Sequence, residues 1–442
     1  MQHWMLKALA ESLGQFRKLT TIRRIGDTLF SLQFGKEHGY FFDMTRGESL
    51  VYPAVAFVET KRYQSPFDAQ LSKRASGSQI EAVTLLNDDK LLAFDLVKQG
   101  SYKSQTCRLV FEFTGKHTNA VLLDEKGVIL EAMRHIPSDV STRPVQVGFP
   151  YTLPPPPTFA KKPAPDNMPP IDTLLAQAYQ ERTHHRLEEK KRLHIAKLHE
   201  QSKRLQQRLD SLEAAEALET KGEQTRKEAD LMLANISRIR PYDTTVTLEG
   251  YDGESVTIRL AAAESVNRKI NLHYAKARRL LSKAKNVHIE EENLRDKIAF
   301  LHKMAAATAN AQDEATLTLL FPKRKIGEKK ELQDDNVERF TIEGFPVWLG
   351  KNEKGNIWLL GNAKAGDMWM HLKDRPSAHV IIRTSKQQLP QSVLLEAAKL
   401  CATFSAPSKG DYPVDYTFRR NVKIKERAFV NYVEYKTLHV RI

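Results

Sequence analysis

Cysteine is scarce in this chain of 442 residues, where only Cys107 and Cys401 occur. Cys107 lies beside an alternating apolar run and Cys401 in an apolar helical pattern, so both are predicted to be buried thiols. So few cysteines are typical of a reducing compartment. No apolar run reaches the roughly eighteen residues of a membrane-spanning helix, and residues 1–7 lack the pattern of a secretion signal. We therefore expect a soluble, cytoplasmic protein with no membrane partner.

Motifs that carry catalysis are also missing. The sequence has no Gly-x-x-x-x-Gly-Lys-Ser/Thr phosphate loop, no Gly-x-Gly-x-x-Gly turn and no Gly-x-Ser-x-Gly elbow. Two cysteines cannot build a cysteine-based zinc knuckle, and His194 and His199 are spaced by five residues rather than four. Asp88 and Asp89 offer ligands for Mg²⁺, but such a pair is more typical of a turn. We expect no catalytic residue, no metal and no cofactor.

Basic residues exceed acidic ones. The chain has 68 Lys and Arg against 54 Asp and Glu, a formal net charge of +14. The excess is clustered in residues 276–285, 323–330 and 419–425. Because each phosphate contact releases counterions, such clusters favour a polyanionic partner. The alternative is a solubilising surface, against which the clustering argues.

Proline marks the clearest domain boundary. Eight of the 20 prolines lie within residues 154–170, a density that forbids helix and favours an extended, semi-rigid linker. Residues 1–153 before it combine a helix from Trp4 to Leu13 with alternating strand patterns, so an α+β domain is predicted. After it we expect a coiled-coil arm at 171–315, a basic connector at 316–336 and a second α+β domain at 337–442.

Two long helices with coiled-coil spacing are predicted in the arm. The first runs from Ile171 to about Asn235 and the second from Glu264 to about Ala311. Residues 244–260 between them have the pattern of a β-hairpin with an Asp-Gly turn, so the helices are expected to fold back as an antiparallel coiled coil. An ordinary helical hairpin is the alternative; charge away from the seam favours an arm that bridges surfaces of a large partner. The predicted seam residues are Ile195, Leu198, Leu205, Leu209 and Leu212, with Ser202 at one seam position, and Ile270, Tyr274, Ala277, Leu281, Ala284, Leu294, Ile298, Leu301 and Ala305.

Residues 367–380 carry the clearest functional signal. A tryptophan, two histidines and basic side chains surround a proline turn there. This mixture is poor core material, whereas Trp and His stack on bases and Lys and Arg neutralise phosphates. We expect an RNA-facing surface; a Trp-anchored β-turn with local histidine hydrogen bonds is the alternative. The RNA-binding candidates are Trp369, His371, Lys373, Arg375, His379 and Arg383.

Strands at 340–350 and 357–360, a helix at 393–404 and closing strands at 432–435 and 437–442 are predicted around this motif. The motif resembles the C-terminal RNA-binding pattern of the NFACT family, Asp-x-Trp-x-His-x-Lys-Asp-x-Pro-Gly-Ser-His-Val, with Ser377-Ala378 in place of Gly-Ser. Residues 115–124 are similar to the family's N-terminal Gly-Arg-His-Ser-Asn-Ile-Ile-Leu-x-Asp. The family includes RqcH-like and NEMF-like proteins and proteins formerly named fibronectin-binding protein A. The resemblance covers nearly the whole chain.

The resemblance implies a tRNA contact in the N-terminal domain. The family's Asp-Arg pair falls on Asp89-Lys90, where lysine keeps the charge but loses the planar fork of arginine. A second tRNA-contacting tripeptide of the family falls on residues 112–114, of which only the glutamate is kept. The tRNA-binding residues implied in this way are Asp89, Lys90, Glu112, Lys116, His117 and Asn119.

Two departures from the family are expected. The helix-hairpin-helix module that usually precedes the coiled coil has no counterpart, because only the proline linker intervenes. The N-terminal domain of the family has a fold like that of formamidopyrimidine-type DNA glycosylases, whose chemistry needs a mature N-terminal Pro followed by Glu. Gln2 follows Met1 here, so glycosylase activity is not expected.

What the resemblance implies is ribosome-associated quality control. Such a protein binds the 50S subunit and its 23S rRNA when a peptidyl-tRNA with its nascent chain is left by a stalled ribosome. It recruits tRNA, of which alanyl-tRNA is the expected type, for template-free alanine tailing, and a small RNA-binding companion is a further expected partner. The ribosome makes the peptide bond, so the protein is not expected to be an enzyme. The alternatives are a surface adhesin for fibronectin-like matrix protein, against which the missing export signal argues, and a glycosylase-type repair enzyme.

Overall fold

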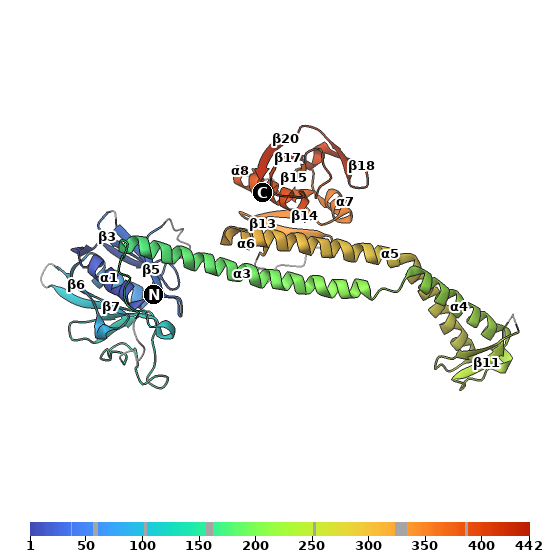
Figure 1. The fold of residues 1–442 in the computed structure, drawn as a ribbon, viewed down its shortest axis with the longest axis horizontal. Coiled ribbons are helices and arrows are strands. Elements are labelled where there is room, and N and C mark those ends of the chain that lie inside the picture. The colour runs from blue at the N-terminus through green and yellow to red at the C-terminus, as the bar shows by residue number, and fades with distance from the viewer. Residues whose placement is uncertain are drawn as a thin grey trace. The chain divides into compact units, whose positions relative to one another are not determined.

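A computed structural model describes residues 1–36, 38–55, 61–100, 104–155, 162–250, 253–322, 334–384 and 388–442. The chain divides into two compact units, residues 1–186 and 187–442, and each is described by itself (Figure 1). Both units mix helices with antiparallel sheets, which confirms the predicted α+β fold class. Within the described residues, no helix is long and apolar enough to span a membrane.

The first unit contains two antiparallel sheets. One has six strands in the order β1-β6-β7-β8-β9-β10, and the other has four in the order β2-β3-β4-β5. The strands are β1 Lys18–Leu19, β2 Thr21–Arg24, β3 Leu29–Phe34, β4 His38–Asp43, β5 Leu50–Pro53, β6 Ser78–Leu85, β7 Leu91–Lys98, β8 Gln105–Glu112, β9 Asn119–Leu123 and β10 Ile129–Ala132. The helical segments are α1 His3–Leu13, α2 Pro66–Gln70, η1 Leu71–Ala75, η2 Leu86–Asp88 and η3 Gly115–His117.

Phenylalanine dominates the core of this unit. Phe42 contacts Phe94 and Phe111, with ring centroids 6.2 and 4.7 Å apart, and α1 covers the same core with Leu6, Leu9 and Leu13. Such aromatic pairs add to the stabilisation that comes from buried area. The predicted helix from Trp4 to Leu13 is thus confirmed. Cys107 is buried in the same core, and burial raises the pKa of its thiol to about 11.

The start of the long helix α3 (Ile171–Asp210) belongs to the first unit. Leu175 is completely buried in that unit's core, and the Tyr179 ring stacks on Tyr52 with centroids 4.0 Å apart. Arg182 adds an ion pair to Asp43 at 3.0 Å. Because these contacts hold the first turns of α3 on the sheets, the compact units divide within α3 rather than at the proline-rich segment.

In the second unit the first predicted helix is interrupted. α3 ends at Asp210 and α4 spans Ala215–Ala234, so the prediction of one continuous helix to about Asn235 was wrong. The Ser211 hydroxyl donates to the Arg208 carbonyl at 2.8 Å, and such local bonds compete with the helical ladder. Ala214 then leaves the helical conformation, with ψ 144°. No proline or glycine signals this break in the sequence.

The second long helix, α5, spans Val266–Asn310, which confirms the prediction. α4 packs closely against it at Gly222, where an added Cβ would lie 2.8 Å from the Leu281 side chain. Strands β11 (Thr245–Glu249) and β12 (Ser255–Arg259) form the predicted hairpin between the helices; residues 251–252 of its predicted turn lie outside the described residues. η4 (Ile236–Arg238) and α6 (Glu314–Leu320) complete this part. The basic residues at 323–330 also lie outside the described residues.

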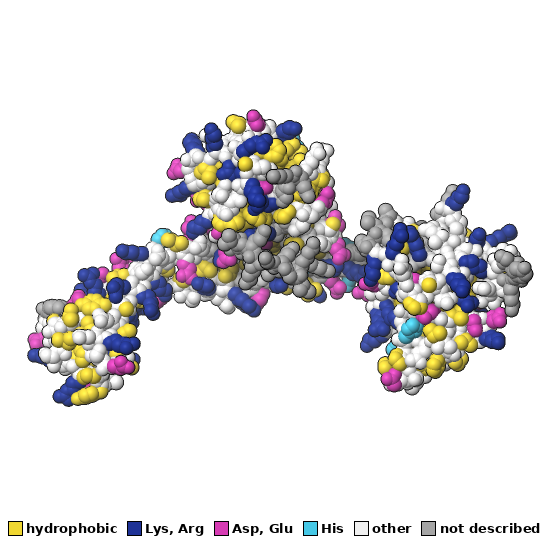
Figure 2. Space-filling view, turned by 180° about the vertical axis from the view of Figure 1, so that it is seen from behind, with side chains coloured by type: hydrophobic (Ala, Val, Ile, Leu, Met, Phe, Trp, Pro, Cys, Tyr) yellow, Lys and Arg dark blue, Asp and Glu magenta, His cyan; other side chains and the backbone are white. Residues whose placement is uncertain are grey.

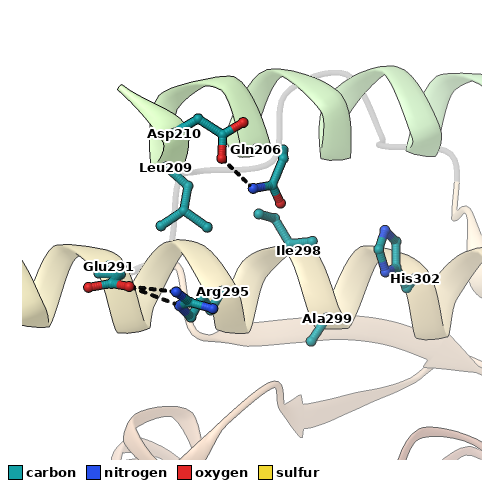
Figure 3. A pocket seen from close by; sticks show the side chains of 8 residues that line it. All are labelled: Gln206, Leu209, Asp210, Glu291, Arg295, Ile298, Ala299 and His302. Carbon is teal, nitrogen blue, oxygen red and sulfur yellow. Dashed lines mark hydrogen bonds and ion pairs between the residues drawn. The ribbon is translucent and has the colours of Figure 1, made fainter. Parts of the chain in front are cut away.

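The end of α3 runs alongside α5 with the predicted seam between them (Figure 3). Leu198 and Ile298 are buried there, as is the polar Ser202, whose hydroxyl lies 2.9 Å from His302 Nε2 on α5. The seam is not filled: a cleft of about 430 Å³ opens beside Leu209, Ile298 and Ala299. Polar side chains rim it, with Gln206 bonded to Asp210 and Arg295 to Glu291. A seam with a polar residue and a cleft gives this section of the helix pair weak apolar packing.

The C-terminal part of the second unit is built on a six-stranded antiparallel sheet in the order β13-β14-β16-β15-β17-β20. Its strands are β13 Val337–Ile342, β14 Phe345–Gly350, β15 Met368–Leu372, β16 Val380–Ile382, β17 Asp411–Phe418 and β20 Lys436–Arg441. A separate hairpin is formed by β18 (Val422–Glu426) and β19 (Phe429–Tyr432) after η5 (Arg419–Asn421). The prediction of a closing strand at 432–435 was wrong beyond Tyr432, where β19 ends. Glu434 takes a left-handed φ of 51°, which a strand does not allow.

One predicted strand of this domain is a helix. Residues 357–360 lie in α7 (Glu353–Asn362). Asn352 is its N-cap, and the Asn352 side chain accepts a hydrogen bond from the Gly355 amide at 2.9 Å. This N-cap satisfies a helix-terminal donor, and it outweighs the strand propensity of the apolar run. The predicted helix at 393–404 is confirmed as α8 (Gln391–Ser405). Cys401 on α8 is fully buried, and burial raises its pKa to about 12.

Candidate nucleic-acid interface

One end of the six-stranded sheet in the first unit gathers the six predicted tRNA-binding residues. β7 begins there at Leu91, opposite Glu112 at the end of β8, and Glu112 lies opposite Asn119 at the start of β9. The Phe113 amide donates to the Lys90 carbonyl at 2.8 Å, which extends the pairing by one residue. Segments 89–90, 112–114 and 116–119 are therefore neighbours, although up to about thirty residues separate them in sequence.

Asp89 and Lys90 follow the tight turn η2. Asn87 and Asp88 take left-handed backbone angles there, with φ 53° and 44°, which Asn and Asp tolerate better than most residues. The acidic pair is thus part of a turn, as predicted. Asp89 is 8% exposed, and its Oδ1 accepts the amide of Lys90 at 2.7 Å. The Lys90 side chain is half-buried, so this turn presents one cation at the sheet end.

Glu112 is occupied by internal partners. Its side chain is 1% exposed and forms an ion pair with Arg143, while the Tyr151 hydroxyl donates to it at 2.7 Å. Burial opposes the charge of Arg143, but the hydrogen bond and the charge of Glu112 raise the Arg143 pKa. Burial, and then Glu112, raise the pKa of Tyr151. Glu112 therefore ties residues 143–151 to the sheet instead of facing solvent.

Asn119 is likewise internal, and the turn before it is exposed. The Asn119 amide donates to the Arg134 carbonyl at 2.9 Å and accepts the Arg134 amide at 3.0 Å, so it clamps β9 to the segment after β10. Lys116 and His117 are exposed in η3. Gly115, with φ +69°, makes the turn possible, and its carbonyl accepts the Gly47 amide at 3.1 Å. Two exposed basic side chains thus lie in the turn between β8 and β9, at the same end of the sheet as Lys90.

The C-terminal motif is mostly buried. Trp369 is completely buried in a core cluster with Trp348, Leu359 and Val422, and His379 is 2% exposed. The expectation that residues 367–380 are poor core material was therefore wrong for these two. The reason is that β15 lies inside the sheet with both faces covered: Met368, Met370 and Leu372 point into the other core of this domain.

Two histidines pack on the Trp369 ring. His371 lies parallel to it with centroids 5.6 Å apart, and His379 lies perpendicular at 5.5 Å. Burial lowers the pKa of His379 to about 3, with smaller contributions from His371 and Arg419, and burial also lowers the pKa of His371. Burial thus disfavours the charged form of both rings. Trp369 Nε1 and His379 Nδ1 have no hydrogen-bond partner within the part of the chain that the structure describes.

The basic candidates of the motif divide into exposed and internal ones. Lys373 Nζ lies 6.0 Å from the centre of the Tyr435 ring, and Arg375 is exposed with its guanidinium 5.9 Å from Tyr412. Arg383 instead pairs with Asp367 at 3.0 Å and lies 4.4 Å over the Trp348 ring. Lys373 and Arg375 can thus reach a ligand, whereas Arg383 is held by the domain itself.

Comparison with known families covers most of the chain. Residues 52–165 and 160–321 match the NFACT N-terminal and middle domains, and residues 337–430 match the NFACT protein RNA binding domain. The chain belongs to the NFACT family. This confirms the resemblance expected from the motifs.

Two curated NFACT relatives carry the name Rqc2 homolog RqcH. The protein from Bacillus subtilis is 29% identical over 257 residues, which are 54% of this chain and 43% of the relative. The protein from Streptococcus suis is 24% identical over 343 residues, which are 72% of this chain and 59% of the relative. The chain thus spans about half the length of the curated relatives it matches. The N-terminal domain of fibronectin-binding protein PavA from Streptococcus pneumoniae is 22% identical, covers 35% of this chain and 61% of its own, and has a TM-score of 0.33.

Sequence reasoning missed several residues around the NFACT motifs. Arg143 and Tyr151 come from an irregular segment, and nothing in their spacing signals that they meet Glu112. Phe429 is 67% exposed and Tyr435 is 46% exposed; both come after the basic cluster at 419–425, so the presence of aromatic residues close to that cluster was the available signal. Among the described residues, no group of three or more His, Cys, Asp or Glu side chains is arranged to hold a metal ion.

Proposed function

We propose that this NFACT chain acts in ribosome-associated quality control. It binds the 50S subunit and 23S rRNA when a peptidyl-tRNA with its nascent chain remains there, and it recruits alanyl-tRNA for template-free C-terminal tailing. A small RNA-binding companion protein joins the complex. The ribosome forms the peptide bond, and the chain contributes by holding tRNA in position, which lowers the entropic part of the barrier without side-chain chemistry.

The observation that carries this proposal is the meeting of three sequence-distant segments at one end of the N-terminal sheet. Lys90, Lys116 and His117 supply the cationic and stacking groups for the tRNA backbone and bases. Asp89, Glu112 and Asn119 act as positioning residues, because their polar atoms bond the chain itself. In this proposal, one part of the family motif contacts tRNA and the other part holds the contacting residues in place.

The C-terminal domain supplies the rRNA contact of this proposal. Lys373 and Arg375 are the side chains offered to phosphates, and the half-buried His371 lies two residues before Lys373 in sequence. Trp369, His379 and Arg383 position the strand and loop that carry these groups from within the core. The formal net charge of +14 supports a polyanionic partner.

The test is recovery of RNA with the full chain from native extract. We expect 50S particles and tRNA to copurify with the wild-type chain, and stalled nascent chains to carry alanine tails. Asp89→Ala with Lys90→Ala is expected to abolish the tails. The matched control is Glu125→Ala with Lys126→Ala, an exposed acid-base pair in the turn at the opposite end of the same sheet, which is expected to leave tailing unchanged.

A charge reversal separates loss of contact from loss of fold. Lys116 is exposed, so Lys116→Glu is expected to keep the unfolding midpoint of the wild type and to weaken tRNA binding. Absence of both tRNA and 50S from the wild-type preparation would overturn the proposal. So would unchanged tailing in the Asp89/Lys90 double variant. Fibronectin-like matrix protein bound by the chain at the surface of intact cells would instead favour the adhesin function.

A further inference from the structure

The hairpin of β18 and β19 has one covered face and one open face. Val422 pairs with Tyr432, and Ile424 pairs with Val430. Val422, Val430 and Tyr432 pack on the core that contains Trp369. In Figure 1 the hairpin lies at the side of the C-terminal domain away from α8. Packing on this core therefore stabilises the hairpin, since two isolated strands are only marginally stable in water.

The open face combines an aromatic ring with charged side chains, and Glu426 is the residue opposite Phe429. Lys423 pairs with Asn431, and Phe429 is two residues from Asn431, so Lys423 and Phe429 share the face opposite Val422. Phe429 is 67% exposed. Lys425 and Arg427 in the same hairpin are exposed, and within the described residues no ion pair joins Lys423, Lys425 or Arg427 to an acid.

A row of aromatic rings links this hairpin to the buried motif. The Trp369 and Tyr432 centroids are 4.8 Å apart, and Tyr432 and Tyr435 are 5.2 Å apart. Tyr435 is 46% exposed, and Lys373 lies over its ring. The Tyr432 hydroxyl donates to Asp415 at 2.8 Å, which fixes the middle ring. Trp369 thus orients, from inside, a surface that ends in an exposed tyrosine with a lysine beside it.

The charge of this surface and its exposed ring indicate which kind of ligand it binds. Residues 417–442 contain seven Lys and Arg and only two Glu, of which Glu434 accepts a bond from Asn421 at 3.0 Å. On the face of the C-terminal domain drawn in Figure 2, Lys and Arg side chains lie with hydrophobic side chains between them and a few Asp and Glu nearby. An exposed ring among cations is suited to unpaired nucleotides, because the ring stacks on a free base and the cations neutralise phosphates. Bases in a duplex are already stacked and offer no free face.

We propose that the β18–β19 hairpin binds single-stranded RNA, with Phe429 and Tyr435 stacking on unpaired bases and Lys373, Lys423 and Lys425 contacting their phosphates. The inference rests on the proposed function in so far as this domain binds RNA, and it names the class of RNA that the domain takes: unpaired segments rather than helical ones. Recognition by stacking is tolerant of sequence, so the hairpin recognises the absence of pairing rather than a base order.

The test is fluorescence anisotropy of the full chain with a fluorescein-labelled, unstructured 12-nucleotide oligouridine. Phe429→Ala is expected to weaken binding about 5- to 100-fold, the effect of one lost stacking contact; Phe429→Trp is expected to retain it. Lys423→Ala is expected to lower the magnitude of the slope of log affinity against log salt by about 0.7. The matched control is Tyr242→Ala, which removes another aromatic side chain, 74% exposed, and is expected to bind like wild type.

Three results would overturn this inference. They are the absence of oligouridine binding by the wild-type chain, wild-type affinity in Phe429→Ala, and equally strong competition by a 12-base-pair RNA duplex. Each leaves the proposed function to its own test, because recovery of tRNA and 50S particles is measured separately. Phe429→Ala removes little buried surface, so an unchanged unfolding midpoint is expected and assigns any loss of binding to the contact itself.

Discussion

Arg143 and Glu112 form an ion pair in which the carboxylate is buried at the end of β8. The Glu112 side chain is 1% exposed and that of Arg143 is 18% exposed. The pair joins an irregular segment to the strand end where the candidate tRNA contacts meet. Its integrity therefore affects both the stability of the first unit and the shape of that sheet end.

Arg143→Ala is expected to lower the free energy of unfolding by about 3 kcal/mol, because it leaves a buried carboxylate without its cation. Urea unfolding followed by circular dichroism measures the change. Arg108→Ala is the control: Arg108 pairs with Asp95 at 2.6 Å, but these side chains are 44% and 26% exposed. An exposed pair contributes less than about 1 kcal/mol. Equal losses in the two variants would contradict this assignment.

The stability of the second unit is expected to depend on pH through His379. Its pKa is lowered from about 6.5 to about 3 by burial, so between these values the unfolded chain binds the additional proton. The folded state therefore has its full stability above pH 6.5. As pH falls from 6.5 toward 3, the free energy of unfolding decreases by up to about 1.4 kcal/mol per pH unit.

His379→Asn is expected to reduce this slope, measured as the free energy of unfolding at pH 7, 6 and 5. His371 is retained in both proteins, so its burial contributes to the slope of both. The control is the exposed His439, whose replacement by Asn is expected to leave the slope as in wild type. A slope that His379→Asn does not change would show that the buried ring binds its proton equally in both states.

Ser202→Leu is expected to stabilise the helix pair. Ser202 is buried at a seam position and lines a cleft of about 490 Å³ with Ile298, so a leucine there has apolar surface to cover. Burial of the added methylene groups is expected to contribute about 1 kcal/mol, offset in part by loss of the bond to His302. A raised thermal midpoint is the readout. Gln201→Leu, one residue away and exposed, is expected to change the midpoint little.

Trp369→Phe is expected to keep RNA binding, whereas Trp369→Ala is expected to lower the free energy of unfolding by about 3–5 kcal/mol. The ring is completely buried, and among the described residues its Nε1 has no hydrogen-bond partner that phenylalanine would leave unpaired. Affinity for tRNA, measured by anisotropy at a temperature where each variant is folded, separates the two effects. A folded Trp369→Phe variant with tenfold weaker binding would mean that the indole contacts RNA directly.

The seam and the motif positions could be predicted because they depend on local spacing. Alternation of three and four residues placed Leu198 and Ile298 on facing helix sides, and the structure buries both. The break at Ser211–Ala214 could not be predicted, because it depends on a serine that bonds its own helix. α7 was missed because its apolar residues also suit a strand, and the Asn352 cap decided between them.

By itself, the sequence determined the antiparallel helix pair through residue type and spacing, and the family and the segments that carry the candidate contacts through the resemblance of its motifs. Only the tertiary structure decided which of those residues reach solvent. Burial depends on what packs against a side chain from elsewhere in the chain: Trp369, His379 and Glu112 acquire neighbours that are remote in sequence. Lys116 and Phe429 remain exposed and can contact a partner.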